Sequence, residues 1–358
     1  SKSFSALSSF LAAEPKMQIT ALRGFAEFLQ GEDDLVYKIQ KQESTASLNP
    51  NAEEDSEIPK REDDTTDSVI PTIMQHHLKA ILRLFQSKNA DVRFQALKVV
   101  FQSLRMGLIN PFQCIPSAIC LLTDENKDVN SDALRLILFF NEKRPKELRN
   151  RAINGIEACF NFQRALNPNF DPFSRDAFSD TFFGGLSRLY ALVAQKREDR
   201  NSFLKAIIDA KIKNGILSAN EKKRKSQAAG LLPKKVAFLC TILANLNYDY
   251  DEPLLIIFYI NKILGTEGSQ LYEFVKNSVD KEDTNVKIDD IKGSQLSIFS
   301  VLIKLQQFLK DAYQLTDAKC ETWTPYLSNK AATQKAGRKL ELVEFLLYDI
   351  PQPGKDSS

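Results

Sequence analysis

The residues of this sequence that are best suited to do chemistry are basic, and they gather in three successive segments between apolar stretches. The first segment has cations at three of five positions, the second is an unbroken run of four, and the third is a pair. Closely spaced cations attract a phosphate backbone through charge, without reading the bases. We predict a DNA-binding site made of Lys196, Arg197, Arg200, Lys205, Lys222, Lys223, Arg224, Lys225, Lys234 and Lys235.

The same cations have alternative interpretations. Any one of them can be a solvated loop charge, and the run Lys222–Lys225 also fits a nuclear localisation patch. Arg200 can instead support the local turn by contacting helix ends. The set as a whole favours a site for an anionic surface, because three consecutive connections present bases at similar places.

The total charge conceals this basic zone. The formal net charge is only +2, but residues 43–67 carry a net −7 and residues 196–235 a net +8. The sequence therefore combines a basic surface with an acidic segment.

Motifs of catalysis are missing from the sequence. It contains no phosphate-binding loop, no dinucleotide fingerprint after a strand, no HExxH and no GxSxG. The five cysteines form no CxxC pair, so we expect free buried thiols, and the adjacent His76 and His77 cannot both face one metal from one helix. We expect no enzyme activity, cofactor or metal.

The elements that carry the basic segments are predicted to be helical repeats. Within residues 90–140 a pattern of valine, alanine, leucine and a base occurs twice, 37 residues apart, and a looser copy begins at Met17. The two clear copies are Val92, Ala96, Leu97, Lys98 and Val129, Ala133, Leu134, Arg135. A period near 40 residues is typical of HEAT repeats, so we predict an all-α solenoid, curved or hook-shaped. An ordinary helical bundle is the alternative.

Polar residues mark where these helices start. Asp91 and Asp128 occupy N-cap or first-turn positions, where a carboxylate faces the positive end of a helix dipole. Asn110 and Pro111 are suited to the N-cap and first position of the next helix. Pro116 in its second turn predicts a kink.

Composition divides the chain into four parts. We expect helical repeats over residues 1–40, an acidic disordered insertion over 41–69, the HEAT solenoid over 70–320, and a C-terminal segment over 321–358 that ends in a disordered tail. No apolar run reaches 18 residues and no secretory signal opens the sequence. Because the chain starts within a helical pattern, we expect it to be a piece of a longer protein.

The basic segments are expected at helix junctions. Residues 195–201 read as a charged turn after a helix over 177–194, and residues 221–230 as a basic connector. Lys234 and Lys235 are expected to open the helix that follows. A preceding loop, residues 167–175, contains Phe170 and Phe173, which should pin it to the solenoid surface.

Three stretches carry a family resemblance. GLINPFQCIPSAICLLTD (Gly107–Asp124), LYALVAQKREDRNSFLKAII (Leu189–Ile208) and FLCTILANLNYDYDEPLLIIFYINKIL (Phe238–Leu264) resemble, in this order, the C-terminal HEAT region of the cohesin loader family, the adherins or Nipped-B-like proteins. The resemblance covers roughly residues 70–320. Its more specific pieces are Asn110, Pro111, Gln113, Cys114 and Pro116, and the helix start Glu252, Pro253, Leu254.

The resemblance implies a function in cohesin loading. Proteins of this family form a hook-shaped HEAT solenoid that binds double-stranded DNA, the kleisin subunit and the ATPase heads of cohesin. They promote loading and ATP hydrolysis by that partner without an ATP site of their own. The family's R-x-x-R-x-x-F-L segment maps onto Arg197, Arg200, Phe203 and Leu204. It also implies a second loader subunit bound by a missing N-terminal part, and a place on chromatin in the nucleus.

The alternative function is a HEAT adaptor that binds only proteins, of the transport-receptor or phosphatase-scaffold type. Such an adaptor would ignore DNA. The basic set in three consecutive connectors favours the loader.

Overall fold

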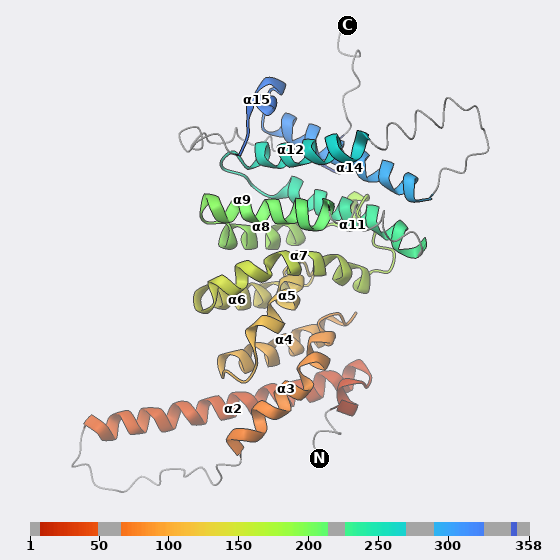
Figure 1. Cartoon of the computed structure of the whole chain (residues 1–358). Coiled ribbons are helices and arrows are strands. Elements are labelled where there is room, and N and C mark those ends of the chain that lie inside the picture. Colours follow the sequence, from red (N-terminus) through yellow and green to blue (C-terminus); the bar gives the residue numbers. More distant parts are fainter. Residues whose placement is uncertain (1–7, 49–65, 214–225, 270–289, 326–344, 349–358) are drawn as a thin grey trace. The chain divides into compact units, whose positions relative to one another are not determined.

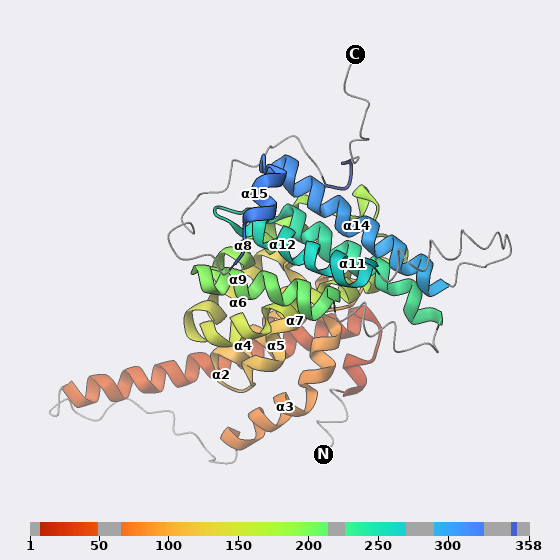
Figure 2. The same cartoon turned by 45° about the horizontal axis from the view of Figure 1, so that its top comes forward.

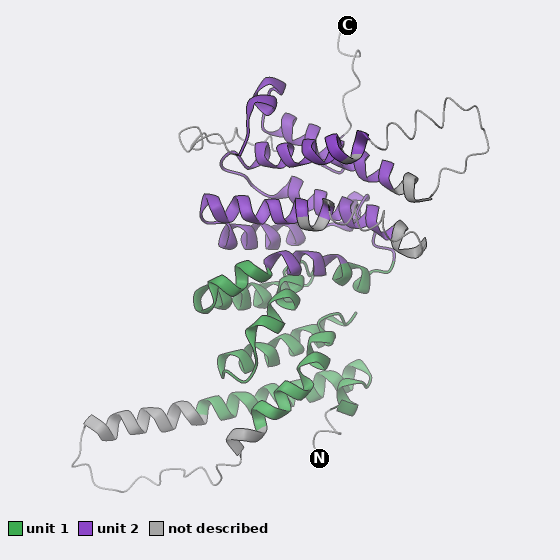
Figure 3. Ribbon diagram, in the orientation of Figure 1, with its two compact units in different colours: residues 1–151, 161–168 green, residues 152–160, 169–358 purple. Residues whose placement is uncertain are grey.

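The computed structural model of the chain describes residues 8–48, 66–213, 226–269, 290–325 and 345–348, and every regular element within them is a helix (Figure 1). The chain divides into two compact units, residues 1–151 with 161–168 and residues 152–160 with 169–358 (Figure 3). Helices pack on one another within each unit, and this all-helical architecture confirms the predicted all-α, HEAT-like solenoid. The hook shape stays a prediction.

Helix α4 is the central element of the first unit, since it packs against α2, α3, α5 and α6. Helix α5 also packs against α6. The helices are α2 (Pro15–Leu48), α3 (Thr66–Leu84), α4 (Ala90–Arg105), α5 (Pro111–Leu121), α6 (Lys127–Lys143) and α7 (Pro145–Leu166), which contributes residues to both units.

The two clear repeats begin in the same way. Asn89 accepts hydrogen bonds from two backbone N–H groups in the first turn of α4, at 2.8 and 3.3 Å. Asn126 does the same for α6, with both distances 3.1 Å. These asparagines are the caps, and Asp91 and Asp128 are the predicted first-turn carboxylates. A repeated cap thus sets the start of each repeat.

The remaining features of the repeat also match the sequence. Ala96 and Ala133 are fully buried, as small residues at close helix contacts should be. Asn110 caps α5 by accepting from the N–H of Phe112 at 2.9 Å, with a proline at the first helical position. Helix α5 continues through Pro116, where the kink stays a prediction.

A buried ion pair joins the two repeats. Arg93 of α4 contacts both carboxylate oxygens of Asp124, at 2.6 and 2.7 Å, and the Asp124 side chain is 0% exposed. Arg93 also donates to the carbonyls of Ser87 and Lys88, while Asp124 accepts from the N–H of Asn126. The pair therefore ties the turn before α4 to the turn before α6.

In the second unit, α11 and α14 lie side by side (Figures 1 and 2). Helix α11 also packs on α8, and α12 packs on α9, α14 and α15. The elements after α7 are η1 (Arg175–Ala177), α8 (Asp180–Val193), α9 (Arg197–Lys205), the π-helix η2 (Ala206–Lys213), α11 (Ser226–Asn245), α12 (Glu252–Ile263), the π-helix η3 (Leu264–Gly268), α14 (Asp290–Ala312) and α15 (Asp317–Thr322).

The loop over residues 167–175 is pinned by one of its two phenylalanines. Phe170 is 5% exposed, and its ring centroid lies 5.6 to 6.3 Å from those of Phe160, Phe178 and Phe238. Phe173 is 43% exposed, so the prediction that both aromatic residues hold the loop is right only for Phe170.

The described helices reach into the expected acidic insertion from both ends. Helix α2 runs to Leu48 and α3 starts at Thr66, while residues 49–65 lie outside the described residues. The expected disordered tail, residues 349–358, also lies outside them. None of the helices in the described ranges is long and apolar enough to cross a membrane.

We predict that Asp124→Asn lowers the free energy of unfolding by about 3 kcal/mol, because it leaves the buried Arg93 charge uncompensated. Asp132→Asn is the matched control, since Asp132 pairs with an Arg135 side chain that is 73% exposed. Its cost should stay within about 0.5 kcal/mol. Chemical denaturation of both variants tests this, and equal losses would contradict the role assigned to the Arg93–Asp124 pair.

Candidate nucleic-acid interface

The first basic segment lies at the start of α9. Lys196 is the last residue before the helix, with extended backbone (φ −97°, ψ 154°), and Arg197 is its first residue. The prediction of a charged turn over residues 195–201 is therefore wrong from Arg197 onward. Glu198 and Asp199 account for the early start, because the helix dipole favours carboxylates in the first turn.

Arg200 faces inward and pairs with a buried carboxylate. Its Nε lies 2.5 Å from Oε1 of Glu252, and the two side chains are 14% and 1% exposed. The two atoms form an ion pair, but their geometry is not that of a hydrogen bond. Arg200 also donates to the carbonyl of Gln195 at 3.1 Å, and its guanidinium lies 4.5 Å from the ring centroid of Tyr250. These contacts match the alternative in which Arg200 supports the local structure.

Arg197 makes a parallel contact between the same two helices. Its Nη2 donates to Oδ2 of Asp251 at 3.1 Å, where the arginine is 30% and the aspartate 6% exposed. Asp251 directly precedes α12 and Glu252 is its first residue. Two adjacent ion pairs therefore fasten the start of α9 to the start of α12, and the two pairs are referred to below as the α9–α12 clamp.

The Glu252 carboxyl is the electrostatic centre of this clamp. Burial raises its pKa, while hydrogen bonds from backbone N–H groups and the positive charge of Arg200 lower it. One of those donors is the N–H of Tyr250, at 2.7 Å from Oε2. Because burial has the largest effect on this pKa, the ionised carboxylate is stable here only with a compensating charge beside it.

The lysine pair lies within α11 and does not open it. The prediction that Lys234 and Lys235 start a helix is wrong, because α11 begins at Ser226 and runs through Pro233. A proline need not end a helix when packing offsets its cost, and Pro233 is buried. Lys235 forms an ion pair with Glu157 of α7, and Lys234 Nζ lies 3.7 Å from a carboxylate oxygen of Asp171.

The six described members of the basic set fall into two groups, those with an ion pair and those that are exposed. Four form ion pairs within the second unit, and Lys196 and Lys205 are exposed without an ion pair to any described residue. Lys205 Nζ lies 5.9 Å from the ring centroid of Tyr259. The run Lys222–Lys225 lies outside the described residues.

A tyrosine cluster near the clamp was missed at the level of sequence. The ring centroids of Tyr190 and Tyr248, and those of Tyr248 and Tyr313, are 5.9 Å apart. Burial raises the pKa of all three hydroxyls, that of Tyr313 to about 12, so they stay neutral at physiological pH. The closely spaced Tyr248 and Tyr250 beside Glu252 are the sequence signal that could have pointed to it.

The thiols and imidazoles are not arranged for chemistry. All five cysteines are free and buried, as predicted, and burial raises the pKa of Cys114 to about 12. His76 is exposed and His77 is buried, and their rings meet edge-on at 4.8 Å. Among the described residues, no group of three or more potential ligands could hold a metal ion.

We predict that Arg200→Met lowers the free energy of unfolding by about 3 kcal/mol at pH 7.5, because it leaves the Glu252 carboxylate buried without a counter-charge. Lys196→Met removes the same charge from an exposed position four residues earlier and should change stability by no more than about 0.5 kcal/mol. Chemical denaturation checks both values, and similar losses in the two variants would refute the clamp.

The loss caused by Arg200→Met should also shrink as the pH falls. The folded-state pKa of Glu252 is raised above its ordinary value, so the ionised carboxyl disfavours folding most above that pKa and the protonated form relieves the cost below it. We expect a smaller difference from the unmodified protein at pH 5 than at pH 7.5. A difference independent of pH over this range would contradict this assignment.

Comparisons with known proteins identify relatives of the whole region. The family model described as sister chromatid cohesion C-terminus matches residues 70–263. Nipped-B-like protein B of Danio rerio is 26% identical over 274 residues, which cover 76% of this chain and 9% of that protein. The Nipped-B-like protein of Homo sapiens is also 26% identical, over 74% of this chain and 9% of its own length. The sister chromatid cohesion protein mis4 of Schizosaccharomyces pombe is 21% identical over 88% of this chain and 19% of its own.

The chain thus spans about a tenth of the length of its vertebrate relatives. The family match covers more than half of the chain and includes both the repeats of α4 to α6 and the clamp between α9 and α12. The chain therefore belongs to the Nipped-B family of sister chromatid cohesion proteins, the cohesin loaders, and corresponds to the family's C-terminal region.

Proposed function

We propose that this chain promotes the loading of cohesin onto DNA by binding both, and that it stimulates the ATPase of cohesin. Membership of the Nipped-B family is the observation that carries the proposal. The proposed mechanism is one of binding. It brings duplex DNA and the ATPase together on one helical scaffold in the nucleus.

Within the basic set, the exposed lysines contact the DNA backbone and the arginines hold them in place. Lys196 directly precedes Arg197, and Lys205 is the last residue of α9. The α9–α12 clamp therefore holds the helix that carries both lysines. The proposed site also includes Lys222, Lys223, Arg224 and Lys225, which lie outside the described residues, and Lys234 and Lys235, whose ion pairs are only partly buried. Contacts of this kind are independent of base sequence and weaken with salt.

The proposed protein partners follow from the family. The kleisin subunit and the ATPase heads of cohesin bind other faces of the repeats, and a second loader subunit binds outside this chain. The relatives are much longer than this chain, so the complete loader uses more surface than is present here.

A HEAT adaptor for proteins alone is the competing function. In that case the exposed lysines would be ordinary solvated charges, and neither DNA binding nor ATPase stimulation would depend on them.

The ATPase rate of purified cohesin with DNA and the full-length protein tests the proposal. We predict that Lys196→Glu/Lys205→Glu lowers the stimulation severalfold, because reversing two exposed charges weakens the contact with DNA that couples it to the ATPase. Lys127→Glu/Lys319→Glu is the matched control, since it makes the same change of charge at exposed positions outside residues 196–235.

The outcomes separate the two functions. Stimulation that survives the control and falls in the α9 variant supports the loader and its site. If stimulation is equal in both variants, the loader function stands but Lys196 and Lys205 are not part of its DNA contact. Absence of stimulation by the unmodified protein, in an assay where another loader works, would favour the adaptor.

A further inference from the structure

A short segment near the C-terminus packs on α14 in the manner of a bound peptide. Residues 345–348 form a turn in which the N–H of Tyr348 donates to the carbonyl of Phe345 at 3.3 Å. This turn places the two aromatic rings on the same side. Phe345 is 3% exposed, whereas Leu347, between them, is 67% exposed. We call residues 345–348 the strap.

Three side chains of α14 hold the strap, and they recur at the spacing of one helical face. Lys304, Phe308 and Asp311 lie at positions i, i+4 and i+7, so they form one stripe along α14. The ring of Phe308 meets those of both strap aromatics, with centroids 5.4 Å from Phe345 and 5.7 Å from Tyr348. We call this stripe the α14 socket.

Polar contacts fix the backbone and the end of the strap. Lys304 Nζ donates to the carbonyl of Leu346 at 3.3 Å and lies 5.5 Å from the ring centroid of Phe345. The hydroxyl of Tyr348 donates to the carboxylate of Asp311, which also accepts from Gln307 at 3.3 Å. The α14 socket therefore contacts three groups of the strap: the ring of Phe345, the backbone carbonyl of Leu346 and the hydroxyl of Tyr348. The first and the last depend on residue type, which gives the pattern Phe-x-x-Tyr.

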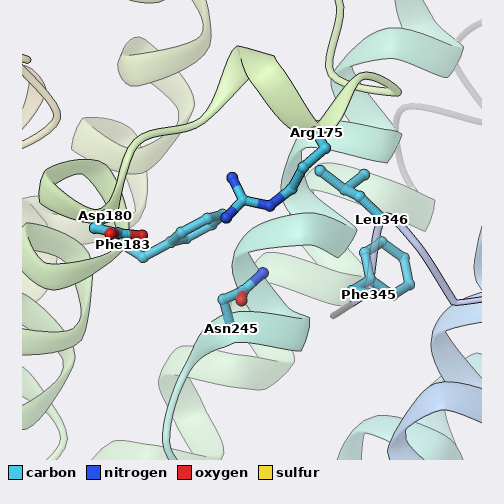
Figure 4. Close-up of a pocket in the computed structure, with 6 residues that line it drawn as sticks. All are labelled: Arg175, Asp180, Phe183, Asn245, Phe345 and Leu346. Carbon is cyan, nitrogen blue, oxygen red and sulfur yellow. The ribbon is translucent and has the colours of Figure 1, made fainter. Parts of the chain in front are cut away.

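The strap also borders a space that it does not fill. A cavity of about 120 Å³ lies beside it, lined by Arg175, Asp180, Phe183, Asn245, Phe345 and Leu346. Figure 4 shows the Arg175 side chain extending across the space above Asn245, with Phe183 on one side and Phe345 and Leu346 on the other. Two strap residues line this cavity and no residue of the α14 socket does, so the cavity adjoins the strap on another side.

We propose that the α14 socket is a peptide-binding site for segments that carry a phenylalanine followed, three residues later, by a tyrosine, and that the strap occupies it in cis. The occupant from a partner is then a segment with the pattern Phe-x-x-Tyr that forms the same turn. It binds by displacing the strap. This inference rests on the second unit alone and does not depend on DNA binding or on cohesin.

A tethered occupant must suppress binding in trans. Intramolecular segments compete at effective concentrations on the order of millimolar, so a free peptide of similar intrinsic affinity cannot replace the strap at micromolar concentration. Releasing the strap by mutation should remove this competition. The proposal therefore predicts that a variant without the aromatic side chains of Phe345 and Tyr348 binds the peptide better than the unmodified protein.

The test uses a fluorescein-labelled peptide of residues 344–349 (EFLLYD) and the full chain. Fluorescence anisotropy gives its Kd for the unmodified protein and for Phe345→Ala/Tyr348→Ala. We expect at least about tenfold tighter binding to the released variant. A peptide with both aromatic residues replaced by alanine should bind neither protein.

Socket variants separate specific binding from general stickiness. In the released background, Lys304→Ala/Asp311→Ala should weaken peptide binding at least about tenfold, because both residues hold the strap through polar contacts. These positions are partly exposed, so the change should spare the fold, which circular dichroism checks. Ile303→Ala, at an exposed position of the same helix, should have no effect.

Two results would overturn the proposal. One is the absence of saturable binding to the released variant. The other is binding that Lys304→Ala/Asp311→Ala leaves unchanged while the fold is intact.

Discussion

Glu252 is 1% exposed and begins helix α12, so its negative charge has to be compensated inside the protein. Arg200 supplies that compensation from the start of α9, and Arg197 adds a second pair with Asp251 one residue earlier. The N–H of Tyr250 and the ring of the same residue complete the surroundings. The relative placement of α9 and α12 depends on these contacts, and with it the positions of the lysines at both ends of α9.

This constraint gives the cations at the start and end of α9 different surroundings. A guanidinium suits a buried pair because it is always charged and presents several donors in a plane, whereas an ammonium on a flexible stem is strongly hydrated and suits a surface. The structure follows this chemistry, with Arg197 and Arg200 turned inward and Lys196 and Lys205 exposed. Among the described cations of this segment, the exposed charges are therefore those of Lys196 and Lys205.

The sequence predicts the helices well where the signal is local. Asp91 and Asp128 and the alanines that follow them recur at fixed spacing, so the repeat could be predicted from the sequence. The caps themselves, Asn89 and Asn126, were not named by that prediction. The interface could not be read in this way. Arg197 and Asp251 are 54 residues apart, and no periodicity reports a contact over that distance. The basic residues could therefore be found from the sequence, but not sorted into those with a buried carboxylate partner and those that are exposed.

The salt dependence of duplex DNA binding tests this division most directly. The slope of log K against log salt would be measured for the unmodified protein, Lys196→Glu/Lys205→Glu and Arg200→Met, at a temperature where all three are folded. Each lost phosphate contact reduces the slope by about 0.9, so we expect a reduction of about 2 for the lysine variant. For Arg200→Met we expect a reduction of less than about 1, because the Arg197–Asp251 pair still fastens α9 to α12. An unchanged slope for the lysine variant, or an equal reduction for Arg200→Met, would contradict the account.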